Sequence, residues 1–138
     1  MKLDQNLVDA AIAQAVERFP TGYAGAAAIY TEDGQIFTSI CFDTLNEIAN
    51  LCHETGAYCE ANRKNLHVTA SVCVSRSTPG DEFIILTPCG ICQERLALWG
   101  RQVEVAVPDM DNHSRWISKT LHQVQPHFWA NIVDIEEP

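Results

Sequence analysis

The sequence has no long hydrophobic run and few basic residues, and these two shortages exclude several classes of protein. No apolar stretch approaches the roughly 20 residues that a helix needs to span a bilayer, and residues 1–5 lack the apolar core of a signal peptide. We therefore expect a cytoplasmic protein that does not act at a membrane. Acidic residues outnumber basic ones by 18 to 9, which gives a formal net charge of −9. Because such a surface repels phosphate backbones, we expect a small-molecule partner and no nucleic acid.

The chain also lacks internal repeats, linkers and low-complexity segments. Its 138 residues, 46% of them hydrophobic, suffice for one domain with a core, so we expect a single domain over residues 1–138. Without a secretion signal, its six cysteines are expected to be reduced or metal-bound. Cys41, Cys59 and Cys73 lie in apolar stretches and are expected to pack as small hydrophobic residues.

Hydrophobic periodicity predicts alternating helices and strands. Residues 3–19 carry apolar residues at helical spacing, and the runs 23–30 and 35–42 flank an Asp-Gly turn that predicts a β-hairpin. The remaining expected elements are a helix over 51–62, a strand over 65–76, a helix over 89–99, a strand over 102–107 and a helix over 114–123. This order predicts an α/β fold, a three-layer α/β/α domain around a mixed five-stranded sheet.

Two cysteine motifs suggest a metal site. Cys89 and Cys92 follow Pro88, and proline is tolerated in the first turn of a helix. The positive end of the helix favours the thiolate form, which binds zinc. A lone C-x-x-C also occurs in redox pairs, but Cys52 stands upstream, two residues before Glu54. Three protein ligands with an open fourth position are the arrangement of a catalytic zinc that activates water.

Helix geometry predicts where these residues must lie. Residues i and i+2 are about 200° apart around a regular helix, at roughly 100° per residue. Cys52 and Glu54 can therefore address one ion only if it sits near the helix axis, beyond the terminus. We expect both in the first turn of the helix over 51–62, with the start of the helix over 89–99 converging on the same point.

The pattern C-x-E followed by P-C-x-x-C is the signature of zinc-dependent nucleobase deaminases, in which the glutamate shuttles protons. On these motifs the chain resembles the cytidine deaminase family over residues 19 to 129, and it is as similar to the small blasticidin S deaminases as to true cytidine deaminases. The segment 24–27, Ala-Gly-Ala-Ala, also looks like the V-G-A-A strand of these enzymes.

The resemblance implies the cytidine deaminase fold and a function. Zn2+ would be bound by Cys52, Cys89 and Cys92, and Glu54 would be the catalytic proton shuttle. The implied reaction is hydrolytic conversion of the 4-amino group of a cytosine nucleoside, cytidine or deoxycytidine, to a carbonyl with release of ammonia. One alternative substrate is a cytosine-containing aminonucleoside antibiotic such as blasticidin S. An alternative of another class is a non-catalytic zinc domain, in which His53 is the one candidate for a fourth ligand.

The chain departs from the family pattern beside the metal motifs. Family members commonly carry arginines after the C-A-E triplet and after the last zinc cysteine, where this chain has Thr55 and Gln93. Three thiolates on one zinc leave one net negative charge, which makes a bound water a poorer acid unless donors neutralise it. His53 and Arg95 are candidates for that role, and surface or structural use is the alternative for both.

The implied substrate contacts also differ. Cytidine deaminases grip the ribose with N-x-E, and the aligned residues here are Cys41, Phe42 and Asp43. Asp43 can accept a hydroxyl hydrogen bond, whereas a thiol replaces an asparagine amide poorly. Near the C-terminus, Trp129 matches an aromatic that in the family reaches a neighbouring subunit of a homotetramer. The candidate substrate-binding residues are therefore Asp43, Cys41, His53, Trp129 and Phe128; a simple aromatic pair is the alternative for the last two.

Overall fold

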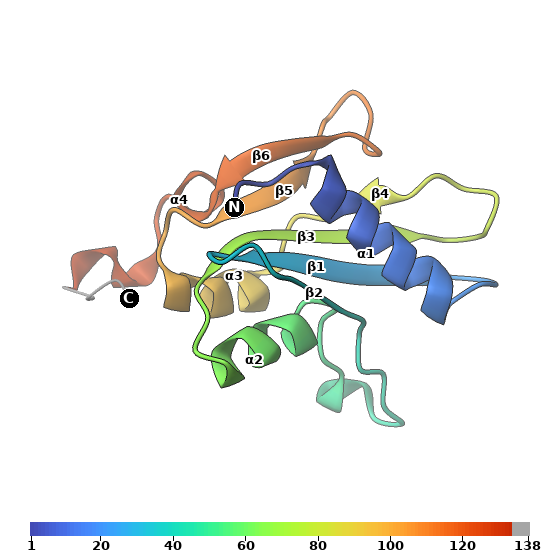
Figure 1. The fold of residues 1–138 in the computed structure, drawn as a ribbon, viewed down its shortest axis with the longest axis horizontal. Helices are drawn as coiled ribbons and strands as arrows, with labels where there is room; N and C mark the ends of the chain where they lie inside the picture. Colours follow the sequence, from blue (N-terminus) through green and yellow to red (C-terminus); the bar gives the residue numbers. More distant parts are fainter. Residues whose placement is uncertain (134–138) are drawn as a thin grey trace.

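The computed structural model describes residues 1–133, which form a sheet of six strands and four α-helices (Figure 1). The helices are α1 (Gln5–Arg18), α2 (Thr55–Arg63), α3 (Gly90–Leu96) and α4 (Leu121–Val124). The strands are β1 (Ala24–Thr31), β2 (Ile36–Ser39), β3 (Val68–Arg76), β4 (Ile84–Ile85), β5 (Glu104–Pro108) and β6 (Trp116–Thr120). None of the described helices combines the length and hydrophobicity that crossing a membrane requires.

The sheet is mixed, as expected, with the order β2-β1-β3-β5-β6 and with β4 paired to β3 beside this path. Strand β1 runs antiparallel to both β2 and β3, while β3 and β5 are parallel. The expected count of five strands is one short of the six in the described residues. The α/β class and the predicted hairpin are confirmed.

The helix expected over residues 114–123 is wrong for most of its length. Residues Trp116–Thr120 form β6, which pairs antiparallel with β5 from Glu104↔Thr120 to Pro108↔Trp116. Side chains along β6 alternate between half-buried and exposed, which is the period of a strand at the edge of a sheet. Only the short α4 is helical, and it begins with a capping box between Thr120 and Gln123.

The sheet lies between two helical layers. On one face, α1 places Leu7 and Ala11 against Val72 of β3, and Asp4 caps the helix by accepting from the Leu7 N–H at 3.0 Å. On the other face, α2 and α3 pack Ala57 and Leu96 against the sheet. Figure 1 shows α1 crossing β1 and β3 on one side, with α2 and α3 together on the other. The three-layer α/β/α arrangement is therefore confirmed.

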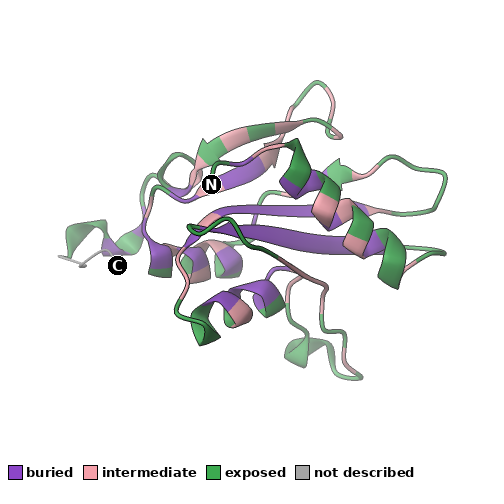
Figure 2. Ribbon diagram, in the orientation of Figure 1, coloured by how far each residue is buried: buried purple, intermediate pink, exposed green. Residues whose placement is uncertain are grey.

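Strand β1 is the centre of the core. All its residues are buried, and Figure 2 shows β1 and β3 buried along most of their length while α1 has an exposed face. Its small residues, Ala24 to Ala28, let helices approach the sheet closely from both sides. The expectation of a central strand beneath a helix is met.

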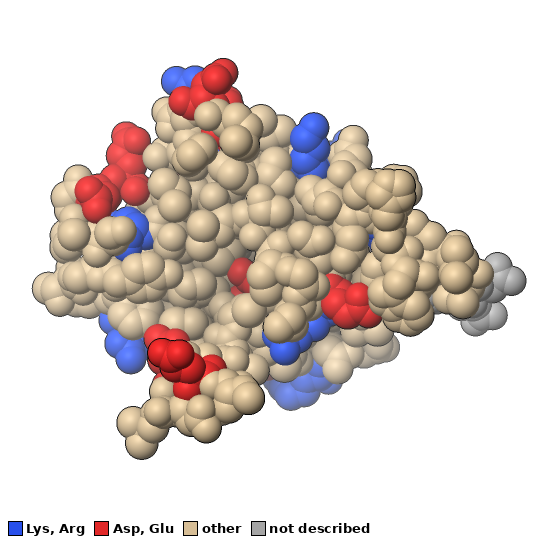
Figure 3. All heavy atoms as spheres, turned by 180° about the vertical axis from the view of Figure 1, so that it is seen from behind, with Lys and Arg blue, Asp and Glu red and all other residues tan. Residues whose placement is uncertain are grey.

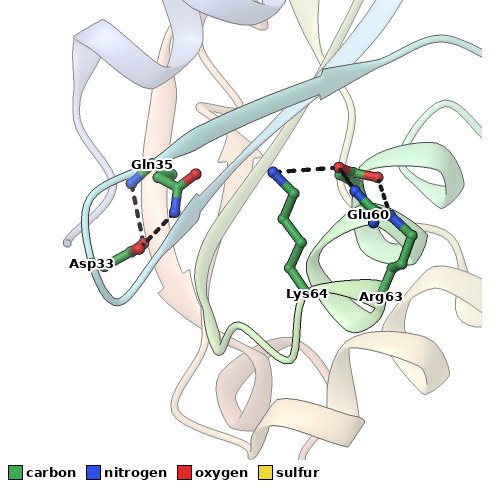
Figure 4. Close-up of polar contacts among 5 residues, drawn as sticks. All are labelled: Asp33, Gln35, Glu60, Arg63 and Lys64. Carbon is green, nitrogen blue, oxygen red and sulfur yellow. Dashed lines mark hydrogen bonds and ion pairs between the residues drawn. The ribbon is translucent and has the colours of Figure 1, made fainter.

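Polar contacts at the surface fix the ends of elements and contribute little energy. In the β1–β2 turn, the Asp33 carboxylate accepts from Gln35 Nε2 at 2.6 Å (Figure 4). On α2, Glu60 pairs with Arg63 at 2.8 Å and with Lys64 at 3.5 Å. The face behind the view of Figure 1 carries acidic and basic side chains scattered among neutral ones (Figure 3).

Candidate active site

Three cysteines converge at the start of two helices. Cys52 lies in the turn before α2, Cys89 is the N-cap of α3, and Cys92 is in the first turn of α3. Their sulfur atoms all lie within 4.8 Å of one another, and the Cys52 and Cys89 sulfurs are 3.4 Å apart. Within residues 1–133 these three form the one group of histidine, cysteine and acidic side chains compact enough to hold a metal ion.

The donor set fits zinc. A tetrahedral zinc with Zn–S bonds of about 2.3 Å places its sulfur ligands roughly 3.8 Å apart. The observed spacing brackets that value. Cys92 is buried, Cys52 is half-buried and Cys89 is exposed, so the cluster is open to solvent on the Cys89 side. Three thiols with one accessible side match a zinc site that leaves a fourth position for water or substrate.

The start of α3 tunes the thiols in opposite directions. Burial raises the pKa of Cys92, and the nearby Glu54 carboxyl raises it further. Burial alone would raise the pKa of Cys89, but hydrogen bonds from the backbone of Cys92 and Ile91 and from the neighbouring cysteine side chains outweigh it, so the pKa is lowered. The exposed thiol at the helix N-terminus is therefore the readiest to ionise, as helix polarity predicts.

Glu54 lies directly beside the cysteines. It is the N-cap of α2, with 4% of its surface exposed, and its carboxyl interacts with the Cys92 thiol. The helix begins at Thr55, so Cys52 and Glu54 precede the first turn in which they were expected. The physical reason is the one that helix geometry gave: residues two apart can face one point only outside the regular helix.

Cys73 of β3 is hydrogen-bonded to Glu54, a contact that the sequence did not reveal. Its side chain is buried, as expected for a small hydrophobic residue. Burial raises its pKa well above the usual range, and the charge of Glu54 and a hydrogen bond to it raise the pKa further. Cys73 thus stays a thiol at neutral pH and can donate to the carboxylate. Its place in an apolar strand gave no sign of this polar partner.

The family's two arginine positions are filled differently here. Arg95 of α3 reaches across to α2, where its Nη1 donates to the buried Thr55 hydroxyl at 2.7 Å. Gln93 uses its amide to donate to the Pro88 carbonyl at 2.8 Å, within the turn that leads into Cys89. Arg95 therefore brings a positive charge next to the residue that follows Glu54, whereas Gln93 braces the cysteine turn.

The His53 ring makes its hydrogen bonds with residues outside the group of three cysteines. Its Nδ1 accepts from the Cys41 N–H at 3.0 Å, and its Nε2 lies 3.1 Å from the Tyr23 hydroxyl. Because Nδ1 accepts a hydrogen bond, the ring proton belongs on Nε2. Burial lowers the pKa of His53, while the carboxylates of Glu54 and Asp43 act in the opposite direction. With both nitrogens engaged, the ring is a structural link and does not join the cysteines as a ligand.

Ser39 makes a second link between β2 and the turn that carries Cys52 and Glu54 into α2. Its hydroxyl donates to the His53 carbonyl at 2.5 Å and accepts from the Ala57 N–H at 3.0 Å. A Cβ on Gly56 would lie 2.9 Å from the Ser39 Cβ, so the two elements touch. Ser39 and Tyr23 were not among the expected site residues; a serine at the end of a strand carries no local signal of such a role.

Cys41 and Asp43 lie beyond the end of β2. Cys41 is half-buried, and its sulfur donates to the exposed Asp43 carboxylate at 3.4 Å. Burial and Asp43 together raise the pKa of Cys41 to about 11, so the thiol remains protonated. The pair therefore presents one carboxylate with a neutral thiol beside it.

A cavity of about 660 Å³ is lined by residues of α2 and α3 and by Phe128 and Trp129. Its lining includes Thr55, the residue that follows Glu54, but none of the three cysteines. Phe128 is buried with its ring 4.4 Å from the Arg101 guanidinium, whereas Trp129 is 65% exposed and its Nε1 donates to Glu94 at 2.9 Å. Both aromatics thus border the helix that follows Glu54, and the exposed indole is available to a second chain.

Comparison with solved structures identifies the family. The cytidine deaminase from Bacillus anthracis is 40% identical, with a TM-score of 0.87, over 91% of this chain and 89% of that one. The chain belongs to the cytidine deaminase superfamily. Cytidine deaminases from Mycobacterium leprae and Burkholderia pseudomallei share the fold at 20% identity, with TM-scores of 0.69 and 0.70 over 91% of this chain. No protein-family model and no curated protein matches the sequence.

The candidate site has a defined position on the fold. The cysteines and Glu54 lie where the N-termini of α2 and α3 meet on one face of the sheet, and α1 covers the opposite face. Short motifs were enough to find this part. The links made by Tyr23, Ser39 and Cys73 depend on how β1, β2 and β3 are brought together, and no single stretch of sequence contains that information.

Proposed function

We propose that the protein is a zinc-dependent hydrolytic deaminase that converts the 4-amino group of a cytosine nucleoside to a carbonyl and releases ammonia. The observation that carries the proposal is the buried Glu54 carboxyl beside three converging cysteines. Burying a carboxylate is costly unless it has partners, and Glu54 has the thiols of Cys73 and Cys92. A site that only holds the fold together has no need of such a group.

The residues divide the chemistry between them. Cys52, Cys89 and Cys92 would hold the zinc, which when bound would supply an activated water at neutral pH. Glu54 takes one proton from the attacking water and gives it to the ring nitrogen next to C4. It then moves the second proton, from the hydroxyl now on C4, to the departing amine. Water is consumed, the C4–N bond breaks, and the products are a carbonyl and ammonia. The Cys73 thiol would steady the carboxylate between these transfers.

Charge around the cysteines supports the same assignment. The N-termini of α2 and α3 both point their positive ends at the cluster, and backbone donors at Cys92 and Ile91 already favour the Cys89 thiolate. Arg95 adds a guanidinium at Thr55. We infer that these groups together offset the excess negative charge of three thiolates, in place of the family's arginines at Thr55 and Gln93.

The test is ammonia release from cytosine compounds by the zinc-loaded protein, with Glu54→Gln as the variant. We expect one zinc per chain in both proteins, and a loss of activity of about 10²–10⁴-fold in the variant, because general acid–base catalysis is lost. Glu60→Gln is the matched control, since the Glu60 side chain on the surface of α2 contacts only the side chains of Arg63 and Lys64 in the described structure. Full turnover in Glu54→Gln would remove Glu54 from the mechanism.

A second candidate substrate is a cytosine-containing aminonucleoside of the blasticidin S type. The specific observation in its favour is the thiol at Cys41, which engages Asp43 and offers no amide to a ribose hydroxyl. Asp43 is an exposed carboxylate, suited to an ammonium or guanidinium group as well as to a hydroxyl. Comparing kcat/KM for cytidine, deoxycytidine, free cytosine and blasticidin S distinguishes the two candidate substrate classes.

We also propose a homotetramer in which Trp129 or Phe128 completes a neighbour's site. The exposed Trp129 at the rim of the 660 Å³ cavity, beside the half-buried Arg95, supports this. The occupant of such a site would be a small molecule, as the net charge of −9 suggests.

A further inference from the structure

The His53 ring joins three segments that are distant in the sequence. Its Nδ1 accepts from the backbone N–H of Cys41, and its Nε2 meets the hydroxyl of Tyr23. The rings of Tyr23 and His53 are also stacked, with centroids 6.3 Å apart and planes 22° from parallel. The residue between a cysteine of the metal group and Glu54 is therefore tied to the end of β2 and to the entry into β1.

Gly25 of β1 makes the space that this ring occupies. A Cβ built on Gly25 would lie 2.6 Å from His53 Cε1, 2.7 Å from Nε2 and 2.8 Å from the Tyr23 hydroxyl. Such distances are far inside van der Waals contact, so any side chain here would displace the ring. Gly25 lies within a regular strand, so what the site requires of it is space and not an unusual backbone angle. The absence of a side chain at Gly25 therefore makes room for the His53 ring against β1.

The ring supplies a hydrogen bond that the sheet does not. Strand β2 ends at Ser39, so the Cys41 N–H lies beyond the ladder with β1. The following residue, Phe42, is held by a single bridge to Leu51. His53 therefore holds the backbone N–H of Cys41, two residues before Asp43, and its ring lies close enough to Glu54 and Asp43 to be affected by the charge of both carboxylates.

We propose that His53 is a positioning residue for the group attached to N1 of the pyrimidine ring, and that Gly25 is its required partner. The inference rests on the proposed deaminase function. In a cytosine ring, N1 is opposite C4, so a substrate with C4 at the cysteines and Glu54 directs its N1 substituent away from the metal. Asp43 carries an exposed carboxylate two residues beyond the Cys41 N–H that His53 holds, and we assign this carboxylate to the N1 substituent. A sugar or similar polar substituent would be bound through this segment.

The first test separates the substituent from the ring with His53→Ala. For cytidine, we expect kcat/KM to fall about tenfold or more, through KM, as one or two well-placed hydrogen bonds are lost. For 1-methylcytosine, which has the same ring without the sugar, we expect a fall of less than about threefold. Zinc content should not change. Equal losses on both substrates would overturn the proposal, as would an unchanged KM for cytidine.

A double-mutant cycle tests whether His53 and Gly25 act through the same space. Gly25→Ala should raise the cytidine KM as His53→Ala does, because the new Cβ displaces the ring. In the His53→Ala background the same change should cost little, since the ring is gone. Gly80→Ala is the matched control, because its Cβ would meet nothing closer than Thr78 Oγ1 at 4.0 Å. Additive losses in the double variant would contradict the shared role.

Amide hydrogen exchange at Cys41 tests the inference without relying on activity. We expect His53→Ala to speed exchange at Cys41, and His53→Asn to restore part of the protection because its side-chain oxygen can replace Nδ1 as acceptor. Unchanged exchange in His53→Ala would overturn the proposal even if the enzyme is active. If the unmodified protein deaminates no cytosine compound, the proposed function fails, while the exchange result still decides whether His53 holds this segment.

Discussion

The two sides of the candidate site are built by different means. On the metal side, Cys89, Cys92 and Glu54 are placed by helix starts that pack on the buried sheet. On the substituent side, Cys41 and Asp43 lie past the end of β2 and are placed by the His53 hydrogen bond to Cys41 and the single bridge from Phe42 to Leu51. Regular structure makes the first side rigid, whereas a few hydrogen bonds determine the second.

This difference separates chemistry from specificity. The reacting group of any cytosine compound is the same, so the metal side needs one geometry that the fold itself enforces. Under the proposed function the substituent would vary between substrates, and a segment held by a few contacts could change without disturbing Glu54 and the three cysteines. The departures from the family pattern at Cys41 and Asp43 fall on that side. The departures at Thr55 and Gln93 lie on the metal side. There the Thr55 hydroxyl accepts a hydrogen bond from Arg95, and the Gln93 amide donates one to the Pro88 carbonyl.

The largest effect is expected on the metal side, from Cys89→Ser. Removing one of three thiolates should lower zinc affinity by at least about 10³-fold, and a change of that size at saturating metal corresponds to about 4 kcal/mol of stability. Metal analysis and thermal unfolding with and without added zinc measure both. Cys59→Ser, at an exposed position on α2, is the control and should keep zinc. If Cys89→Ser binds zinc normally and melts normally, the cluster is not a metal site.

An intermediate effect is expected from Trp129→Ala, which tests whether one chain is enough. The indole is 65% exposed and adjoins the cavity beside α2 and α3. If it reaches a neighbouring chain, its removal should weaken association by about 2 kcal/mol, roughly 30-fold, as for a typical aromatic hot spot. Light scattering across a concentration series gives the oligomeric state. A fully active monomer in the unmodified protein would show that each site is complete in one chain.

The same contrast explains what the sequence revealed. The motifs at Cys52, Glu54, Cys89 and Cys92 are local, so their spacing predicted the elements that carry them. Periodicity predicted the hairpin, β3 and β5, because each buries a face. It failed at 114–123, where a helix was expected, since β6 is an edge strand whose structure comes from pairing with β5.

The contacts of the substituent side were beyond such reasoning for a physical reason. His53 meets Cys41 at a separation of 12 residues and Tyr23 at 30, and the close approach of Gly25 depends on the position of the whole strand. From sequence alone, a glycine in an alanine-rich strand indicates only a small residue and not a close approach to a side chain. The partnership between that glycine and a histidine follows from tertiary packing, which no local pattern encodes.

The smallest effect is expected from Cys41→Asn, and it sharpens the comparison most. An asparagine here would restore an amide that can donate to a ribose hydroxyl, while the Cys41 backbone N–H would still be held by His53. One hydrogen bond of about 1 kcal/mol corresponds to roughly a fivefold gain in kcat/KM for cytidine. Free cytosine, which has no sugar, should show no gain and serves as the internal control. A gain shared by both substrates would place the effect on the metal side. The unmodified protein gives a second check. If it prefers cytidine by a hundredfold or more over the other cytosine compounds, the Cys41 thiol does not weaken the sugar site. If only cytidine gains, the substituent side can be tuned independently of the chemistry.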